Sequence, residues 1–274
     1  MKKNIKLLDF KLKKNLWADI FWAYKSKFHW TWLDFIEHRE YIFWDSVKNI
    51  DWKASAKSDK LYVKKFEEQR NIKIHFILDL NDSFYFFKKK LEKLKELLYT
   101  LAISANKNGD LISFSYFENN KLVFNKHSLS LEALFKVIDK IDEKKVYWDL
   151  EKQIEYLNKI KLENNLVFIL SDKDSLENTK QLKLLNLKNE VIFINIFDYF
   201  ENNLEDIDWF VKFSKNSDLL EINLKNEKKI EEYKKLRKNK LKKFKFSLEK
   251  LGLDYLYIDS SLNTYKELLK FFSV

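Results

Sequence analysis

The chain has 274 residues, of which 46% are hydrophobic and 34% are charged, and its formal net charge is +10. This composition is typical of a globular protein with a solvated surface, long enough for one large domain or two small ones. The lack of cysteine excludes disulfides and thiolate metal sites. No apolar run approaches the ~20 residues that cross a bilayer, and no signal peptide is evident, so we expect a cytoplasmic protein without a membrane span.

From residue 72 onward, short apolar segments alternate with segments whose apolar residues recur every three or four positions. The first pattern predicts buried strands and the second predicts helices. In chain order we expect a strand at 72–80, a helix at 86–105, a hairpin at 110–124, helices at 130–140 and 149–161, a strand at 165–170, a helix at 175–186, a strand at 190–197, a basic amphipathic helix from about 225 to 252, a strand at 254–259 and a last helix at 263–272.

This alternation predicts the fold class. Strands that are apolar on both faces and alternate with helices indicate a mostly parallel sheet covered by helices on each side. We therefore expect an α/β domain with a doubly wound, Rossmann-type sheet over residues 71–274. Residues 1–70 do not share the alternation, and we expect them to form an N-terminal extension of irregular or β structure that packs against this domain.

Two of the predicted strands are followed by acidic and polar residues. The first strand ends in a loop that carries Asp79, Asn81 and Ser83, and the strand at 165–170 ends beside Asp172. In an open parallel sheet, ligands collect beyond the carboxyl ends of the strands, and hard oxygen ligands of this kind suit Mg²⁺. The alternative is structural: Asp82 or Ser83 would cap the following helix.

A second dense polar stretch covers residues 34–70 and reads DFIEHREYIFWDSVKNIDWKASAKSDKLYVKKFEEQR. It resembles the signature of the bacterial domain of unknown function 58 family, which contains R-x-Y-x-x-G-D, I-D-W-x-x-S-A and V-K-x-F-E-x-E-R. Members of that family resemble a von Willebrand factor A domain after the signature, so the resemblance implies this fold for the rest of the chain. The signature residues in register are Arg39, Tyr41, Asp45, Asp51, Trp52 and Arg70.

The charged signature residues have two interpretations. We favour a buried ion-pair network of Arg39, Asp45, Asp51 and Arg70 that ties the N-terminal region to the sheet. The alternative is a docking surface for a partner, because charged loops can serve either purpose. The histidines show no zinc-binding spacing, and we expect His75, inside a strand, to be a packed residue.

The resemblance also gives the acid-bearing loops a specific interpretation. The von Willebrand fold usually carries a metal-ion-dependent adhesion site, D-x-S-x-S, with a distant threonine and aspartate. Asp79, Asn81 and Ser83 match the first motif with asparagine in place of one serine, and Asp172 is the candidate for the distant acid. No threonine occurs near residues 146–149. The resemblance thus implies a degenerate adhesion site, with Mg²⁺ as the candidate cofactor.

Glycine is rare in this chain, with two residues where about 7% is usual. The family signature has glycine at three positions where this sequence has tryptophan, and four other tryptophans lie where glycine is equally plausible. Some bacterial lineages read UGA as glycine, and a translation that reads UGA as tryptophan would print these residues. The alternative is true tryptophans on an aromatic binding surface. The positions concerned are Trp17, Trp22, Trp30, Trp32, Trp44, Trp148 and Trp209.

No nucleophile–base pair, P-loop or dinucleotide fingerprint is visible, so we expect no enzyme activity. Family members resemble partners of MoxR-type AAA+ ATPases, which act in chaperone-like maturation of other proteins. The resemblance therefore implies a protein-interaction module that contacts such an ATPase and an unknown client protein through the acid-bearing edge.

The alternative function is a nucleic-acid or anionic-surface binder that uses the basic helix at 225–250, where 12 residues are basic and 4 are acidic. Its binding would fall steeply with salt. Only three of the 52 basic residues are arginines, whereas proteins that read base sequence commonly rely on arginine forks. The sequence therefore predicts no specific nucleic-acid recognition.

Overall fold

The computed structural model describes residues 33–45, 47–58, 60–68, 72–118, 121–128, 130–143, 149–176, 179–202, 211–215, 218–222 and 227–272. None of the helices in these ranges is long and apolar enough to cross a membrane. Several residues singled out from the sequence lie outside the described ranges, namely Trp17, Trp22, Trp30, Trp32, Arg70, Trp148 and Trp209.

A six-stranded sheet forms the centre of the molecule, with the strand order β10-β7-β6-β3-β4-β5. All neighbours pair in parallel except β5, which forms an antiparallel hairpin with β4 at one edge. The predicted doubly wound, mostly parallel sheet is thus confirmed. The strands are β3 (Lys73–Leu78), β4 (Leu111–Glu118), β5 (Lys121–Ser128), β6 (Leu166–Ser171), β7 (Glu190–Phe197) and β10 (Asp254–Asp259).

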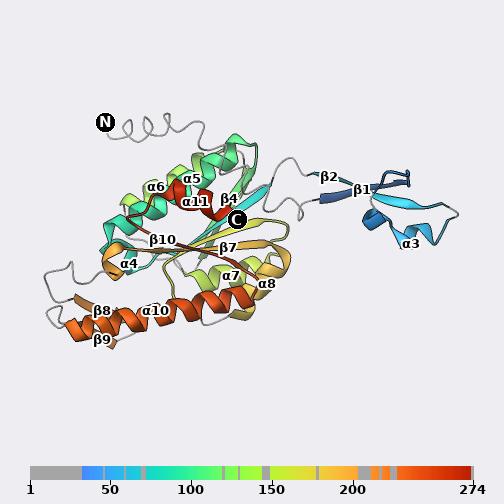
Figure 1. Ribbon diagram of the computed structural model, residues 1–274. Helices are drawn as coiled ribbons and strands as arrows, with labels where there is room; N and C mark the ends of the chain where they lie inside the picture. The colour runs from blue at the N-terminus through green and yellow to red at the C-terminus, as the bar shows by residue number, and fades with distance from the viewer. Residues whose placement is uncertain are drawn as a thin grey trace.

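Helices cover both faces of this sheet (Figure 1). One face is covered by α5 (Lys88–Lys107), α6 (Glu132–Glu143) and α11 (Thr264–Phe272). The opposite face is covered by α7 (Leu150–Lys159), α8 (Thr179–Lys188) and α10 (Glu227–Lys250). Side chains alternate across a strand, so β3 sends Phe76 into the first layer and Ile77 into the second.

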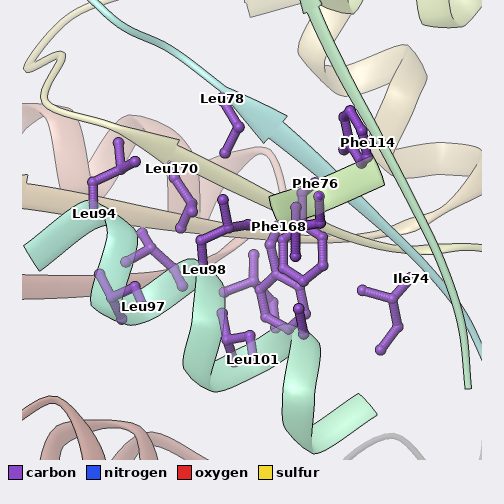
Figure 2. Packing of buried hydrophobic residues seen from close by; sticks show 14 of the residues in the cluster. Ile74, Phe76, Leu78, Leu94, Leu97, Leu98, Leu101, Phe114, Phe168 and Leu170 are labelled. Carbon is purple, nitrogen blue, oxygen red and sulfur yellow. The ribbon is translucent and has the colours of Figure 1, made fainter. Parts of the chain in front are cut away.

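The packing of the first layer shows why α5 lies against the sheet. On α5 the apolar residues recur at helical spacing, and Leu94, Leu98 and Leu101 all face the sheet (Figure 2). There they meet Phe76 and Phe168, whose stacked rings have centroids 5.6 Å apart. Burial of a side chain of this size stabilises the fold by about 1.5–3 kcal/mol. This layer therefore fixes α5 firmly over β3 and β6.

Short elements differ from the sequence-based expectation. The predicted helix at 86–105 is confirmed as α5, but a single-turn helix, α4 (Asp82–Phe86), precedes it and was not expected as a separate element. The two are separate because Phe87 between them adopts an extended backbone. A small sheet of β8 (Val211–Lys215) and β9 (Asp218–Ile222) was not predicted. Another short helix, α9 (Tyr199–Asn202), follows β7.

The basic helix α10 ends as predicted, beside Gly252. Gly252 has a φ of +74°, a left-handed backbone conformation that favours glycine. The predicted apolar stripe faces the sheet: Phe244 and Leu248 are buried and belong to the second layer. The opposite face of α10 is exposed and rich in lysine.

The N-terminal signature forms its own small sheet, as the prediction of β structure in this region implies. Strands β1 (Leu33–Glu40) and β2 (Tyr62–Glu68) pair antiparallel, and between them lie η1 (Val47–Asn49) and the short helix α3 (Trp52–Ser55). Figure 1 shows this sheet to one side of the helix-covered sheet. The strongest contacts of its described elements are with one another, and the expected packing of residues 1–70 against the α/β domain stays a prediction.

Candidate functional site

The candidate site lies at the carboxyl ends of β3 and β6, two neighbouring strands at the centre of the sheet. From β3 the chain continues towards β4 and β5, whereas from β6 it continues towards β7 and β10 on the other side. This reversal creates the place where doubly wound folds commonly bind ligands. The two loops are joined directly, because the Asp79 backbone N–H donates to the Leu170 carbonyl over 3.0 Å. The structure thus brings the predicted acid-bearing loops together.

Asn81 joins the two loops through its side chain. Its carbonyl oxygen accepts a hydrogen bond from the Ser83 backbone N–H at 2.9 Å and caps the start of α4. Its amide group donates to Asp172 Oδ1 at 2.6 Å. The prediction that Asp82 or Ser83 caps this helix is therefore wrong. Asn81 is the cap, and Asp82 and Ser83 are the first two residues of the helix.

Asp79 faces the protein interior and has an exposed fraction of 2%. Its carboxylate accepts a hydrogen bond from Ser171 Oγ at 2.6 Å. Burial raises the pKa of Asp79 to about 7, against the opposing effects of the positive charge on Lys173 and the hydrogen bond from Ser171. Asp79 is therefore partly protonated near neutral pH.

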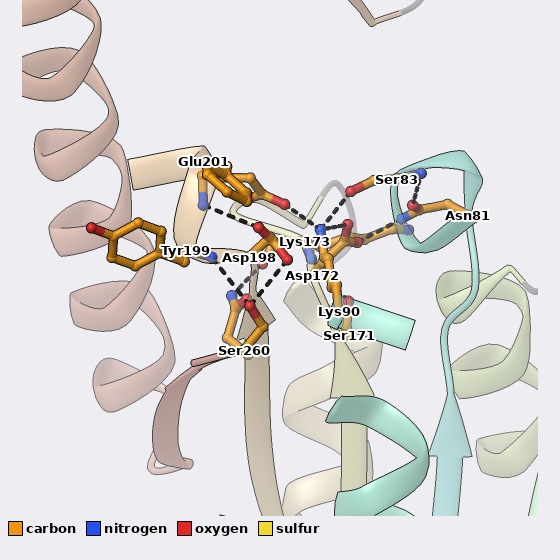
Figure 3. Close-up of polar contacts among 12 residues, drawn as sticks. Asn81, Ser83, Lys90, Ser171, Asp172, Lys173, Asp198, Tyr199, Glu201 and Ser260 are labelled. Carbon is orange, nitrogen blue, oxygen red and sulfur yellow. Dashed lines mark hydrogen bonds and ion pairs between the residues drawn. The ribbon is translucent and has the colours of Figure 1, made fainter. Parts of the chain in front are cut away.

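A lysine that the sequence patterns did not single out lies at the centre of this cluster. Lys90, in the first turn of α5, has an exposed fraction of 1%. Its Nζ donates to Ser83 Oγ at 2.5 Å, to Asp172 Oδ2 at 2.5 Å and to Glu201 Oε1 at 2.7 Å (Figure 3). An ammonium group has three N–H donors, and these three oxygens accept all of them. The Asp172 side chain is itself only 7% exposed.

Glu201 extends the cluster to α10. Its second carboxylate oxygen pairs with the Arg237 guanidinium group. Arg237 also donates to the Tyr233 hydroxyl at 3.0 Å and lies 4.8 Å from the centre of the Phe197 ring. The ion-pair cluster of Lys90, Asp172, Glu201 and Arg237 therefore connects α5, the end of β6, α9 and α10 across the edge of the sheet.

The loops after β7 and β10 are fixed next to this cluster. Ser260, just beyond β10, donates from its hydroxyl to Asp198 Oδ2 at 3.0 Å and accepts from the Tyr199 backbone N–H at 3.2 Å. Asp198 in turn accepts from the Phe200 backbone N–H at 3.0 Å. These contacts hold α9 in place, and the Tyr199 ring points away from the ion-pair cluster (Figure 3).

The oxygens at this edge do not fit the expected magnesium ion as they are placed. Mg²⁺ requires near-octahedral oxygen ligands at about 2.0–2.1 Å. Here the Lys90 ammonium contacts Ser83 and Asp172, two of the four predicted ligands, and the Asp79 carboxyl group is turned to Ser171. Among the residues that the structure describes, no group of three or more acidic or histidine side chains is placed to hold a metal ion.

The signature residues make local contacts within the N-terminal sheet. Arg39 forms a two-pronged ion pair with Asp45, with one of its bonds 2.7 Å long, and the Ile42 backbone N–H donates to the same carboxylate at 2.9 Å. Hydrogen bonding to Arg39 lowers the pKa of Asp45. The pair is partly exposed, so the expected buried network that reaches the α/β domain is not found among the described signature residues.

Asp51 organises the centre of the signature. One carboxylate oxygen accepts from the backbone N–H groups of Lys53 and Ala54, both at 3.0 Å, and so caps α3. The other lies 2.9 Å from His38 Nε2. Trp52 follows this cap as the first residue of α3 and is largely exposed.

Two aromatic signature positions lie in the loop after β1. The Tyr41 backbone N–H donates to the Leu61 carbonyl at 2.8 Å, which closes the loop onto the segment before β2. Trp44 lies in a turn with 88% of its surface exposed, and its ring packs edge-on against Phe43. The signature therefore builds a small capped unit with an exposed aromatic side.

Sequence reasoning missed Lys90 because it lies in the run Lys88-Lys89-Lys90, which has the appearance of an ordinary solvated helix start. Arg237 is one of only three arginines in the chain, and its rarity was the one available signal. That signal does not identify Glu201, the partner that Arg237 shares with Lys90, because both contacts depend on the tertiary fold.

A doubly wound α/β domain with an ion-pair cluster at its switch point and a capped N-terminal hairpin is the class of protein that these observations define. The family model "Protein of unknown function DUF58" matches residues 37–243. The chain belongs to the DUF58 family, as the signature predicted. Among solved structures it is similar to "Crystal Structure of the SpRpn10 VWA domain", with 11% identity, a TM-score of 0.37 and coverage of 73% of this chain and 94% of that chain. No curated protein matches this chain.

Proposed function

We propose that this protein is a non-enzymatic protein-interaction module that binds its partner at the carboxyl edge of the six-stranded sheet. The observation that carries the proposal is an apolar rim on a rigid base. Phe86, which ends α4, is 71% exposed, and Tyr199 and Leu262 are also exposed. They follow β3, β7 and β10, so all three belong to loops at the same edge of the sheet.

The base under this rim is held by buried polar contacts. Lys90 and Asp172 are joined in the ion-pair cluster, and Lys93 on the same helix donates to the Leu262 carbonyl at 2.7 Å. A rim on a fixed base loses little conformational freedom on binding, which favours affinity. Aromatic side chains are also enriched where protein partners bind.

The surroundings of His75 favour a structural role for this residue over a catalytic one. Its imidazole nitrogens lie 2.7 Å from Ser113 Oγ and 3.0 Å from Ser115 Oγ. All three residues are fully buried. A nucleophile and a base sealed in the core have no access to a substrate, so this arrangement supports a structural role.

The partner that we propose is an AAA+ ATPase of the MoxR type, which would act with this module in the chaperone-like maturation of an unknown client protein. The class of partner follows from the resemblance of DUF58 proteins to MoxR-associated proteins. In this proposal the ATPase supplies the work, and the edge of the sheet supplies the binding surface.

The experiment is an affinity capture from lysate of the source organism with the tagged full-length chain, followed by mass spectrometry. We expect an AAA+ ATPase among the captured proteins, and we expect Phe86→Ala to lose most of it. The matched control is Leu187→Ala, because Leu187 is 72% exposed but lies on α8. Failure to capture any AAA+ ATPase with the unmodified chain would contradict the proposed partner.

The alternative of nucleic-acid binding through α10 is less favoured by the arrangement of that helix. Its arginine, Arg237, is directed to Glu201 at the edge of the sheet and to Tyr233. The exposed face of α10 is therefore basic through its lysines, and lysine is a weaker reader of bases than arginine. Anionic-surface binding by α10 stays a prediction that the salt dependence of binding would test.

A further inference from the structure

The ion-pair cluster at the carboxyl edge balances its charges without any bound ion. Two carboxylates, Asp172 and Glu201, face two side-chain cations, Lys90 and Arg237. Charges that are removed from water are stable only when they are paired and hydrogen-bonded. The cluster meets this condition, and the addition of a divalent cation would leave it with excess positive charge.

The Lys90 ammonium group also contacts two of the side chains that the adhesion-site pattern assigns to a metal ion. These are Ser83 and Asp172, which come from the two acid-bearing loops. Aromatic rings enclose the ammonium group as well: Nζ lies 5.1 Å from the centre of the Phe84 ring and 6.0 Å from that of Phe197. Such rings attract a cation through their faces.

We propose that the Lys90 ammonium group replaces the divalent metal ion at this edge, so that the module holds its loops in place by a cation of its own and works without metal. The α5 helix supplies this cation from within the chain. The proposal stands on the geometry of the cluster, whichever partner binds the rim.

The test compares Mn²⁺ binding to the full-length chain and its variants by electron paramagnetic resonance of the free ion. The wild-type chain is expected to show no saturable Mn²⁺ binding at millimolar concentrations. Lys90→Ala removes the internal cation and leaves Asp172 and Glu201 in place, so this variant is expected to gain a saturable Mn²⁺ site and to melt at a higher temperature when Mn²⁺ or Mg²⁺ is added. The double variant Lys90→Ala, Asp172→Asn is expected to lose that site.

Lys93→Ala is the matched control. Lys93 is also buried on α5, but its Nζ donates to Thr264 Oγ1 at 2.9 Å, away from the acid-bearing loops. Its loss is expected to create no metal site. The proposal would be overturned if the wild-type chain bound Mn²⁺ saturably and the Asp172→Asn substitution abolished that binding. It would also be overturned if the Lys90→Ala variant gained neither Mn²⁺ binding nor a higher melting temperature with Mn²⁺. This holds both for a variant that folds without the metal and for one that does not.

Discussion

His75 lies in the central strand β3 with no exposed surface, and burial lowers its pKa to about 3. Both ring nitrogens are within hydrogen-bonding distance of serine hydroxyls, and the ring stacks on Phe124 at 5.4 Å. The charge of His127 acts in the same direction as burial, and the pKa of His127 is itself lowered by burial. The folded protein therefore holds His75 neutral well below the pH at which a free histidine becomes charged.

This burial predicts a loss of stability in acid. In the unfolded chain, His75 binds a proton below pH 6.5, whereas in the folded chain it does so only near pH 3. Its contribution to stability is therefore fully present above pH 6.5 and falls by about 1.4 kcal/mol for each pH unit below that, down to about pH 3. Urea unfolding at pH 7, 6, 5 and 4 would measure this slope.

His75→Gln keeps hydrogen-bonding groups at this position but does not titrate. We expect this variant to lose about 1–3 kcal/mol at pH 7 from imperfect packing and to depend less steeply on pH than the wild type. Equal slopes for the wild type and His75→Gln would contradict the burial effect.

Trp44 gives a direct test of the interpretation that several printed tryptophans are glycine. Its side chain is exposed in a turn, so the indole ring adds little to the core of the signature. We expect the tryptic peptide of residues 40–48, taken from protein purified from the source organism, to have the mass of a chain with glycine at this position. A peptide with the mass of tryptophan, or a TGG codon in the source gene, would refute the interpretation.

At the scale of single elements, the signature depends on the cap of α3. A four-residue helix has almost no stability of its own, and Asp51 supplies two hydrogen bonds to its first turn. We expect Asp51→Ala to cost about 1 kcal/mol and to raise hydrogen exchange at the Lys53 and Ala54 amides about fivefold. Asp51→Ser, which keeps a capping oxygen, is expected to stay close to the wild type.

Exchange that stays unchanged in Asp51→Ala would show that the cap does not order this helix. The pairing of β1 with β2 is expected to survive both substitutions, because the ladder uses backbone hydrogen bonds. Local exchange therefore separates the loss of the cap from unfolding of the hairpin.

Most long elements could be predicted from their hydrophobic period. The helix α5 and the strands β6 and β7 follow directly from apolar spacing, because each buries a regular face against the sheet. The break between α4 and α5 could not be predicted, since it depends on the extended backbone of Phe87. The β8–β9 hairpin was missed because its short segments lack a strong alternating pattern.

The candidate site was predictable only in part. The topology of a parallel sheet brings Asp79 and Asp172 to one edge, and their loops were identified from the sequence. The identity of the cation at that edge was not predictable, because Lys90 reaches it only after α5 packs on the sheet. Its partner Glu201 comes from α9, more than a hundred residues away. Local sequence patterns carry no information about a contact between residues so far apart in the chain.

At the scale of the whole molecule, the strand order explains why the rim lies at the carboxyl edge of the sheet. Loops from β3, β6, β7 and β10 emerge at one edge. The ion-pair cluster fastens those after β6 and β7 to α5 and α10, and Lys93 on α5 holds the loop after β10. The capped signature hairpin lies apart from this edge in Figure 1. The molecule therefore offers two separate exposed surfaces, of which the rim lies over buried ion pairs.

The central claim is that this rim binds a partner protein, and the most direct measurement is the affinity of the purified AAA+ ATPase for the wild-type chain, Phe86→Ala and Leu187→Ala. Loss of an aromatic anchor commonly costs about 2 kcal/mol of binding free energy, and each 1.4 kcal/mol is tenfold in Kd. We predict that Phe86→Ala weakens binding more than about tenfold and that Leu187→Ala leaves it nearly unchanged, with both variants as stable as the wild type. Equal affinities for all three chains would contradict the assignment of this edge as the binding surface.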